Sequence, residues 1–302
     1  MVCLYYKQQL NKQGHTHMRI LQKHNIIDLF VWVDDSLPKE LRYSRKLTPN
    51  NCRKIGRPAM LSVSEIITIL LFSNLTAPQK LLKDIWKWAI TNHSDDFKIP
   101  CYSKFVEHCH KAIPHMERLL KGLLDSDANL RFIDSTMLPV CRQCRVDSHK
   151  VAKECAKWGR NHQGWWYGFK LHAAINEKGI FAAIWFTPAN EADSQQIPKL
   201  VDDSTDVAVG DGGYNADVMR RHMWRDHRCY ILAPPHPKQD KKLARKIQIE
   251  LLRTREKIEC VFDYLKNHLN LVTSFPRSVN GYFLNYLRNL LGYQLGKLLG
   301  VI

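Results

Sequence analysis

The stretch AVGDGGY, residues 208–214, ends a short apolar run on a carboxylate and then continues with two glycines. Open α/β sheets bind ligands beyond their strand ends, and glycines there let the chain turn without side chains that crowd the ligand. A second acid, Asp134, lies inside the apolar stretch LRFIDSTMLPV of residues 130–140. Burying a lone carboxylate is costly unless it is paired or binds a metal. Taken singly, each acid also fits an ordinary role, with Asp211 capping a turn and Asp134 paired with an arginine.

The segments around these acids alternate between strand and helix patterns. Short apolar, β-prone stretches occupy residues 130–140, 165–176, 179–188, 205–211 and 228–234. Helical periodicity occupies residues 193–200, 216–227 and about 241–267. Three strands that pair antiparallel, followed by alternating helices and strands, predict an α/β fold with a mixed sheet.

The chain before this region has a different pattern. In residues 1–125 apolar residues recur at three- and four-residue steps, interrupted by several prolines. This periodicity predicts a helical N-terminal domain, residues 1–125, ahead of an α/β domain of residues 126–302. Within the first domain, the basic kink Gly56-Arg57-Pro58 resembles the minor-groove hook of architectural DNA binders, which makes Arg57 a candidate DNA contact. An ordinary loop before a helix is the alternative.

A third acid comes from the long helix predicted near the end of the α/β domain. At 100° per residue, Arg255, Glu259 and Lys266 fall on one helical face. The neighbouring face is an apolar stripe of Ile258, Val261, Phe262, Leu265 and Leu269. A helix of this kind packs on a sheet and presents Glu259 at the margin of the contact. An Arg–Glu pair four residues apart on a solvated helix face is the structural alternative.

The composition favours a polyanionic partner. The chain of 302 residues carries 45 Lys and Arg against 29 Asp and Glu, a net charge of +16. Charge alone also fits a merely soluble basic surface. No signal peptide or membrane-spanning run is present in the sequence, and nine cysteines form an odd number, so we expect a cytoplasmic protein with reduced thiols. Three carboxylates suit Mg²⁺, which prefers oxygen ligands and acts in pairs on phosphodiesters.

Five motifs follow one another along the chain. They are FIDST around Asp134, GWWYGFKLH from Gly164, TPANEADS from Thr187, GDGGY around Asp211, and R-x3-E-x6-K at Arg255, Glu259 and Lys266. The series resembles bacterial insertion-sequence DDE transposases, which belong to the retroviral integrase superfamily and have a ribonuclease H-like core. It is most like the insertion sequence 982 family, and the resemblance covers roughly residues 55 to 295.

The resemblance implies a function and a set of roles. Asp134, Asp211 and Glu259 would be the catalytic, metal-binding triad, with Mg²⁺ as the cofactor and Mn²⁺ as a substitute. Arg255 and Lys266 would contact DNA beside the cut. The protein would be a DNA transposase that cleaves transposon ends and joins them to target DNA, as a homodimer on DNA and associated with the nucleoid. The alternatives are a ribonuclease H-like nuclease without joining activity and a DNA-binding protein derived from a transposase.

Further candidates surround this core. Lys170 and His172 alternate with apolar residues in the second strand and are candidate DNA contacts, although a solvated strand face explains them as well. Trp165 and Trp166 are candidates for stacking on an unpaired base or for the core. The linker between the first two predicted strands is a candidate DNA-contacting arm, with basic residues Arg142, Arg145, Lys150, Lys153, Lys157 and Arg160. Its Cys141, Cys144, His149, Cys155 and His162 raise a zinc site as the alternative.

Overall fold

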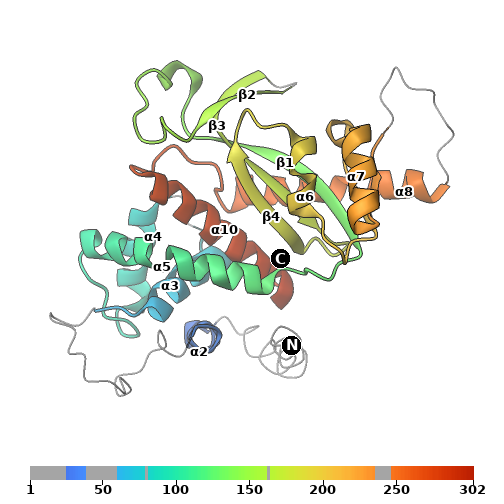
Figure 1. The fold of residues 1–302 in the computed structure, drawn as a ribbon. Helices are drawn as coiled ribbons and strands as arrows, with labels where there is room; N and C mark the ends of the chain where they lie inside the picture. The colour runs from blue at the N-terminus through green and yellow to red at the C-terminus, as the bar shows by residue number, and fades with distance from the viewer. Residues whose placement is uncertain (1–24, 39–59, 79–80, 162–163, 235–245) are drawn as a thin grey trace, which may run out of the picture. The chain divides into compact units, whose positions relative to one another are not determined.

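The computed structural model describes residues 25–38, 60–78, 81–161, 164–234 and 246–302. The chain forms two compact units, one of Met1–Gly122 with Phe283–Ile302 and one of Leu123–Tyr282 (Figure 1). The predicted domains of residues 1–125 and 126–302 stay a prediction; the division after Gly122 lies close to the predicted boundary, and Phe283–Ile302 is grouped with the first unit.

The second unit is built on one mixed sheet. Its strands are β1 (Leu130–Pro139), β2 (Lys157–Asn161), β3 (Gly164–Ile175), β4 (Phe181–Pro188), β5 (Val207–Val209) and β6 (Tyr230–Leu232). The order is β2-β3-β1-β5-β6, and β4 also pairs with β3. Strands β1 to β4 pair antiparallel, whereas β1–β5 and β5–β6 are parallel. The predicted mixed α/β sheet is confirmed, and β2 is an additional strand.

Strand β3 pairs with three others because its two halves have different neighbours. On one edge, residues 164–168 pair with β2 and residues 169–175 pair with β4, while residues 168–175 pair with β1 on the other edge. Gly168 marks the change of partner, since a side chain there would collide with the carbonyl oxygen of Leu138. A glycine is thus required where the two strand pairings meet.

Helices cover both faces of this sheet. One face carries η2 (Asp193–Gln196), α6 (Ile197–Leu200), η3 (Gly212–Tyr214) and α7 (Asp217–His227). Their buried residues form a core with Ile133 and Ala174 of the strands. The opposite face of β1 contacts α9 (Glu256–Asp263), which follows α8 (Lys246–Thr254). The sheet is therefore the middle layer of three.

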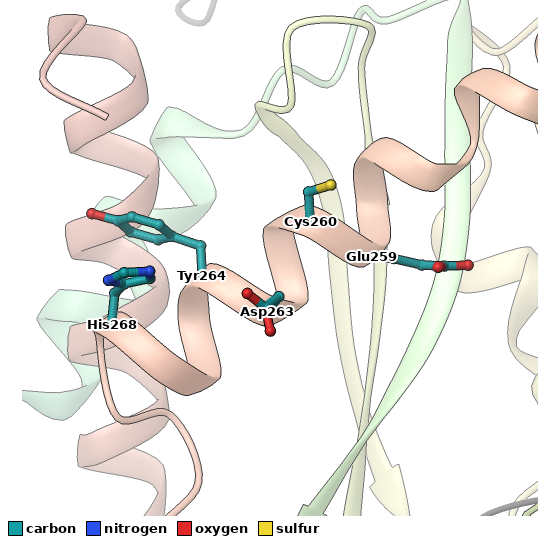
Figure 2. Close-up of a pocket in the computed structure, with 5 residues that line it drawn as sticks. All are labelled: Glu259, Cys260, Asp263, Tyr264 and His268. Carbon is teal, nitrogen blue, oxygen red and sulfur yellow. The ribbon is translucent and has the colours of Figure 1, made fainter.

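The long helix predicted for residues 241–267 is interrupted in two places. It is divided at Arg255 between α8 and α9, and its last turn, η4 (Tyr264–His268), is a π-helix (Figure 2). Residues 241–245 lie outside the described part. The predicted apolar stripe is confirmed, because all five of its residues are buried: Ile258, Val261, Phe262, Leu265 and Leu269.

In its described part, the first unit contains helices and no strand. These are α2 (Ile26–Ser36), α3 (Val63–Thr76), α4 (Leu82–His93), α5 (Tyr102–Leu123) and, from Phe283 onward, α10 (Val279–Leu299). Helix α3 begins with a capping box of Ser62 and Glu65. Among the helices that the structure describes, none is long and apolar enough to cross a lipid bilayer. The predicted all-helical domain of 1–125 includes residues 1–24 and 39–59, which lie outside the described part, and stays a prediction.

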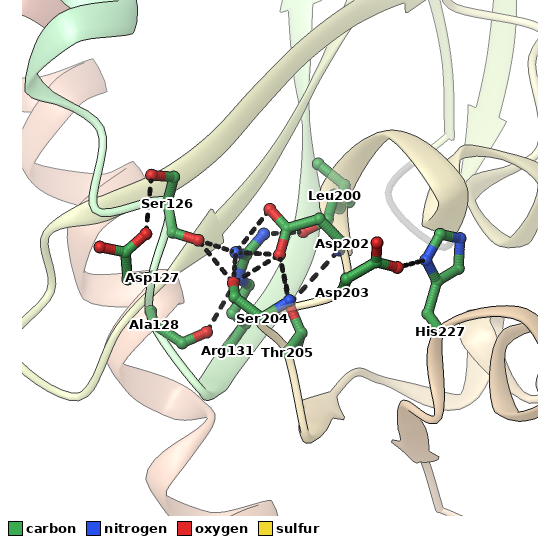
Figure 3. A network of polar contacts seen from close by, with 10 residues as sticks. All are labelled: Ser126, Asp127, Ala128, Arg131, Leu200, Asp202, Asp203, Ser204, Thr205 and His227. Atoms are coloured by element: carbon green, nitrogen blue, oxygen red, sulfur yellow. Dashed lines mark hydrogen bonds and ion pairs between the residues drawn. The ribbon is translucent and has the colours of Figure 1, made fainter. Parts of the chain in front are cut away.

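A buried arginine holds the beginning of β1 in place. Arg131 is 1% exposed and donates hydrogen bonds to the carbonyl oxygens of Ser126, Ala128 and Leu200. Its Nη2 also lies 2.8 Å from each carboxylate oxygen of Asp202 (Figure 3). Next to it, Asp203 pairs with His227 at 2.6 Å. The network connects β1 to the segment between α6 and β5, two elements that position the acids described below.

Neighbouring aspartates allow this network to be tested. Asp202→Ala leaves the Arg131 guanidinium buried without its counter-charge and should lower the free energy of unfolding by about 2–3 kcal/mol, somewhat less than for a fully buried pair. Asp203→Ala removes only an exposed pair and should cost about 0–1 kcal/mol. Urea denaturation of the full chain measures both. Equal midpoints for the two variants would show that Arg131 does not depend on Asp202.

Candidate active site

The first acid, Asp134, lies on the face of β1 that α9 covers. Its side chain is 16% exposed, and its Oδ1 accepts a hydrogen bond of 2.7 Å from the backbone N–H of Ser135. Burial raises the pKa of Asp134 to about 7, and the charges of Asp211 and Glu259 add to this rise, while the Ser135 N–H and Arg255 oppose it. Such a carboxyl is poised to bind a cation, because a positive charge would relieve its buried charge.

Strand pairing brings Asp211 beside Asp134. Strands β1 and β5 are parallel, with Phe132 opposite Val209. Asp134 lies two positions after Phe132, and Asp211 lies two positions after Val209. Asp211 caps η3, with Oδ1 accepting a 2.9 Å hydrogen bond from the N–H of Gly213. Neither Gly212 nor Gly213 has a positive φ, so the turn needs no special backbone freedom. A side chain at Gly212 would meet nothing within 4 Å, so this position is open beside the acid.

Helix α9 contributes Glu259, and Arg255 connects it to Asp134. The Nη2 of Arg255 lies 2.7 Å from Oε1 of Glu259, and its Nη1 lies 3.5 Å from Oδ2 of Asp134. Both Arg255 and Glu259 occupy the face that helical periodicity predicted. The three predicted acids thus come from β1, the end of β5 and α9, and the charges of Asp211 and Glu259 both raise the pKa of Asp134.

Lys266 reaches the same region from the π-helical turn η4. Burial lowers the pKa of Lys266, and the negative charges of Asp134 and Asp263 oppose the shift. The amine therefore lies within electrostatic range of Asp134. An α-helix was predicted here, and the wider π-turn changes the direction in which the following residues point; such turns are frequent at functional sites.

A shallow depression adjoins the third acid on the outer side of the helix. It is lined by Glu259, Cys260, Asp263, Tyr264 and His268 (Figure 2). The rings of Tyr264 and His268 stack with centroids 4.8 Å apart at one end, and Glu259 extends toward the strands at the other. The helix surface next to Glu259 is therefore open to a ligand.

Lys170 and His172 lie on the other face of the sheet, away from α9. The Nζ of Lys170 forms an ion pair of 2.9 Å with Asp193. His172 is fully buried, its Nε2 lies 2.9 Å from Thr187 Oγ1, and burial lowers its pKa to about 4. A buried neutral imidazole has no surface for a phosphate, so the predicted DNA contact of His172 does not agree with the structure. The alternation of polar and apolar residues along β3 suggested that His172 is exposed. In the structure, η2 and α6 lie on the face of the sheet that carries it.

The structure adds two residues to the surroundings of the acids. Asp193, in the motif TPANEADS, holds Lys170 and lies 3.8 Å from Nδ1 of His172. Tyr214, the last residue of AVGDGGY, is fully buried, and its pKa is raised by burial and by the charges of Asp193, Asp134 and Asp211. Both residues belong to motifs identified in the sequence, Asp193 to TPANEADS and Tyr214 to GDGGY. Sequence spacing alone did not indicate that they pack behind the acids.

Two other predictions receive no geometric support. Arg57 lies outside the described residues, as does His162 of the alternative zinc set. Cys141, Cys144 and Cys155 are free thiols. Within the ranges that the structure describes, no three His, Cys, Asp or Glu side chains lie close enough together to hold a metal as they stand, and this applies to the acids as well.

The donor chemistry of the three acids nevertheless fits a hard divalent cation. All the donors are carboxylate oxygens, as Mg²⁺ and Mn²⁺ prefer. Arg255 now occupies one oxygen of Asp134 and one of Glu259, so it supplies the positive charge that such a cation would bring.

The raised pKa of Asp134 predicts an effect on stability in metal-free protein. Its pKa of about 7 in the folded state exceeds the ordinary value of 3.8, so the folded state binds more protons between these values and stability falls as pH rises through them. Asp134→Asn should remove this loss and become more stable than the wild type by roughly 2–4 kcal/mol at about pH 8. Asp263→Asn, on the exposed side of α9, should follow the wild type.

Urea denaturation in EDTA at several pH values measures this difference. If the free energy of unfolding changes with pH in the same way in the wild type and in Asp134→Asn, the pKa of Asp134 is not raised in the folded state. Mg²⁺ should stabilise the wild type and leave Asp134→Asn unchanged.

Comparison with known proteins agrees with this geometry. Residues 125–279, which are 155 of the 302 residues, match the family described as the transposase DDE domain. The match nearly coincides with the compact unit Leu123–Tyr282 and includes all three acids. A search of curated proteins finds no match. The family implies DNA as the partner, a nuclease or transposase activity and divalent metal ions, and the chain belongs to this family of transposase DDE domains.

Proposed function

We propose that the protein is a Mg²⁺-dependent DNA transposase of a bacterial insertion sequence, similar to the insertion sequence 982 family. The observation that carries the proposal is the convergence of Asp134, Asp211 and Glu259 from three separate elements, with the pKa of Asp134 raised to about 7. Like charges gathered in a half-buried site are unfavourable for stability alone. Their cost is understandable where a cation binds, so the family match and the electrostatics support the same role.

Each residue of the site has a proposed task. Asp134, Asp211 and Glu259 would hold Mg²⁺, or Mn²⁺ in its place. Bound divalent ions make water a better nucleophile and stabilise the leaving oxygen of a phosphodiester. Arg255 would move from Asp134 and Glu259 to a DNA phosphate, where its planar group binds two oxygens. Lys266 would contact a phosphate as a point charge. Lys170 would influence the three acids indirectly, through the ion pair that it forms with Asp193.

The proposed reaction has two steps. Water attacks the phosphodiester at the end of the element, and the 3′-oxygen leaves with a proton as a free hydroxyl. That hydroxyl then attacks target DNA, so that one phosphodiester bond forms as another breaks. Recognition of the ends is assigned to the helical N-terminal unit with Arg57, and the pairing of two ends to a homodimer on cytoplasmic, nucleoid-associated DNA. The basic balance of the chain, 45 Lys and Arg against 29 Asp and Glu, supports this partner.

A cleavage assay on DNA that carries the element's terminal repeats tests the proposal. Asp211→Asn should slow cleavage by about 100-fold or more, because it removes several kcal/mol of charge stabilisation, and binding in EDTA should stay unchanged. Asp217→Asn is the matched control, since its side chain is 67% exposed at the start of α7. Undiminished cleavage by Asp211→Asn would refute the site. If the protein cleaves the ends but does not join them to target DNA, it is a nuclease and not a transposase.

A further inference from the structure

The hairpin of β2 and β3 exposes two tryptophans outside the proposed catalytic site. Trp158 is 42% exposed and Trp165 is 52% exposed, and their rings meet edge to face with centroids 6.4 Å apart. They line a shallow depression together with Gln143, whose amide donates to the carbonyl oxygen of Trp165. The guanidinium of Arg160 lies 5.4 Å from the centre of the Trp165 ring. Two exposed aromatic rings in contact with each other form a small apolar surface that a flat ligand can cover.

These side chains share a sheet face with the first acid. Trp165 lies opposite Arg160, Trp158 lies opposite Tyr167, and Asp134 lies opposite Ala173. Residues 165, 167 and 173 of β3 are an even number of positions apart and therefore point to the same side. The two tryptophans therefore lie on the same side of the sheet as Asp134, although Phe169, Leu171 and Ala173 between them are buried.

The strand register also gives the separation. The level of Asp134, at Ala173, and that of Trp158, at Tyr167, are six positions apart along β3, which corresponds to about 20 Å at about 3.3 Å per residue. At this distance the tryptophans cannot contact the phosphodiester that is cleaved. The distance equals about six nucleotides of DNA at 3.4 Å each.

The charge around the hairpin suits a nucleic acid. Within residues 141–161 only Asp147 and Glu154 are acidic, and six exposed residues are basic: Arg142, Arg145, Lys150, Lys153, Lys157 and Arg160. A phosphate backbone is attracted to such a surface, whereas a second copy of the same surface is repelled. The bases of a paired duplex offer no free face to an aromatic ring, so the fitting partner has an unpaired base.

We propose that Trp158 and Trp165, with Arg160, form a stacking platform for an unpaired base of the substrate DNA, about six nucleotides from the cleaved bond. Stacking on indole is favourable for every base and therefore needs no particular sequence, and Arg160 adds a contact to the adjacent phosphate. The inference rests on the proposed function for the DNA that it concerns. It adds a second contact point, remote from the acids, that detects a locally opened duplex.

The test measures DNA binding in EDTA, where no cleavage occurs. Fluorescence anisotropy compares a fully paired end duplex with duplexes that hold one unpaired 2-aminopurine at successive positions. The wild type should prefer the unpaired duplex by about tenfold and quench its 2-aminopurine, most strongly about six nucleotides from the cleavage point. Trp158→Ala and Trp165→Ala should each abolish the preference and the quenching and leave affinity for the paired duplex unchanged.

Two other exposed tryptophans serve as matched controls. Trp185 is 42% exposed with Lys199 5.1 Å from its ring, and Trp224 is 52% exposed with Arg228 6.0 Å from its ring. Trp185→Ala and Trp224→Ala should bind like the wild type. Trp165→Phe, which retains an aromatic face, should restore most of the preference and guards against a folding defect in the alanine variant.

The outcomes separate this inference from the proposed function. The platform is refuted if Trp158→Ala and Trp165→Ala retain the preference, or if they reduce self-association in sedimentation while DNA binding stays unchanged. In either case, cleavage that depends on Asp211 would leave the proposed function intact. A wild type that binds no DNA of either kind would refute both.

Discussion

The parallel pairing of β1 with β5 is the constraint on which the rest of the site depends. With Phe132 opposite Val209, the chain delivers Asp134 and Asp211 to the same level of the sheet. A shift of one residue in this register would turn one of the acids to the opposite face. The Arg131 network anchors the beginning of β1 and the segment before β5, so the buried polar contacts of Figure 3 support the register that the site requires.

Electrostatics then explains the remaining parts of the site. The side chain of Asp134 is largely buried, and its pKa rises to about 7 as a result of this burial and of the charges of Asp211 and Glu259. Arg255 relieves part of the cost by contacting both Asp134 and Glu259. In the proposed function, a cation and a DNA phosphate together would replace these contacts of Arg255.

Much of this site was predictable from local patterns. Alternating strand and helix stretches gave the mixed sheet, and helical periodicity placed Arg255 and Glu259 beside the apolar stripe that begins at Ile258. The patterns could not show that the face of β3 that carries His172 is covered, so His172 was taken for a surface residue although it is fully buried. Nor could they show the π-turn that carries Lys266 or the short strand β2, because both depend on tertiary packing.

The central claim is that Asp134, Asp211 and Glu259 bind one divalent metal centre when Arg255 is displaced. Anomalous diffraction from crystals of the protein with Mn²⁺ and a duplex of the element's end tests it most directly. The account predicts an anomalous peak within about 2–2.6 Å of oxygens from Asp134 and Asp211, with Glu259 turned toward it and Arg255 on a phosphate. A peak elsewhere, with Arg255 still joining Asp134 to Glu259, would contradict the account.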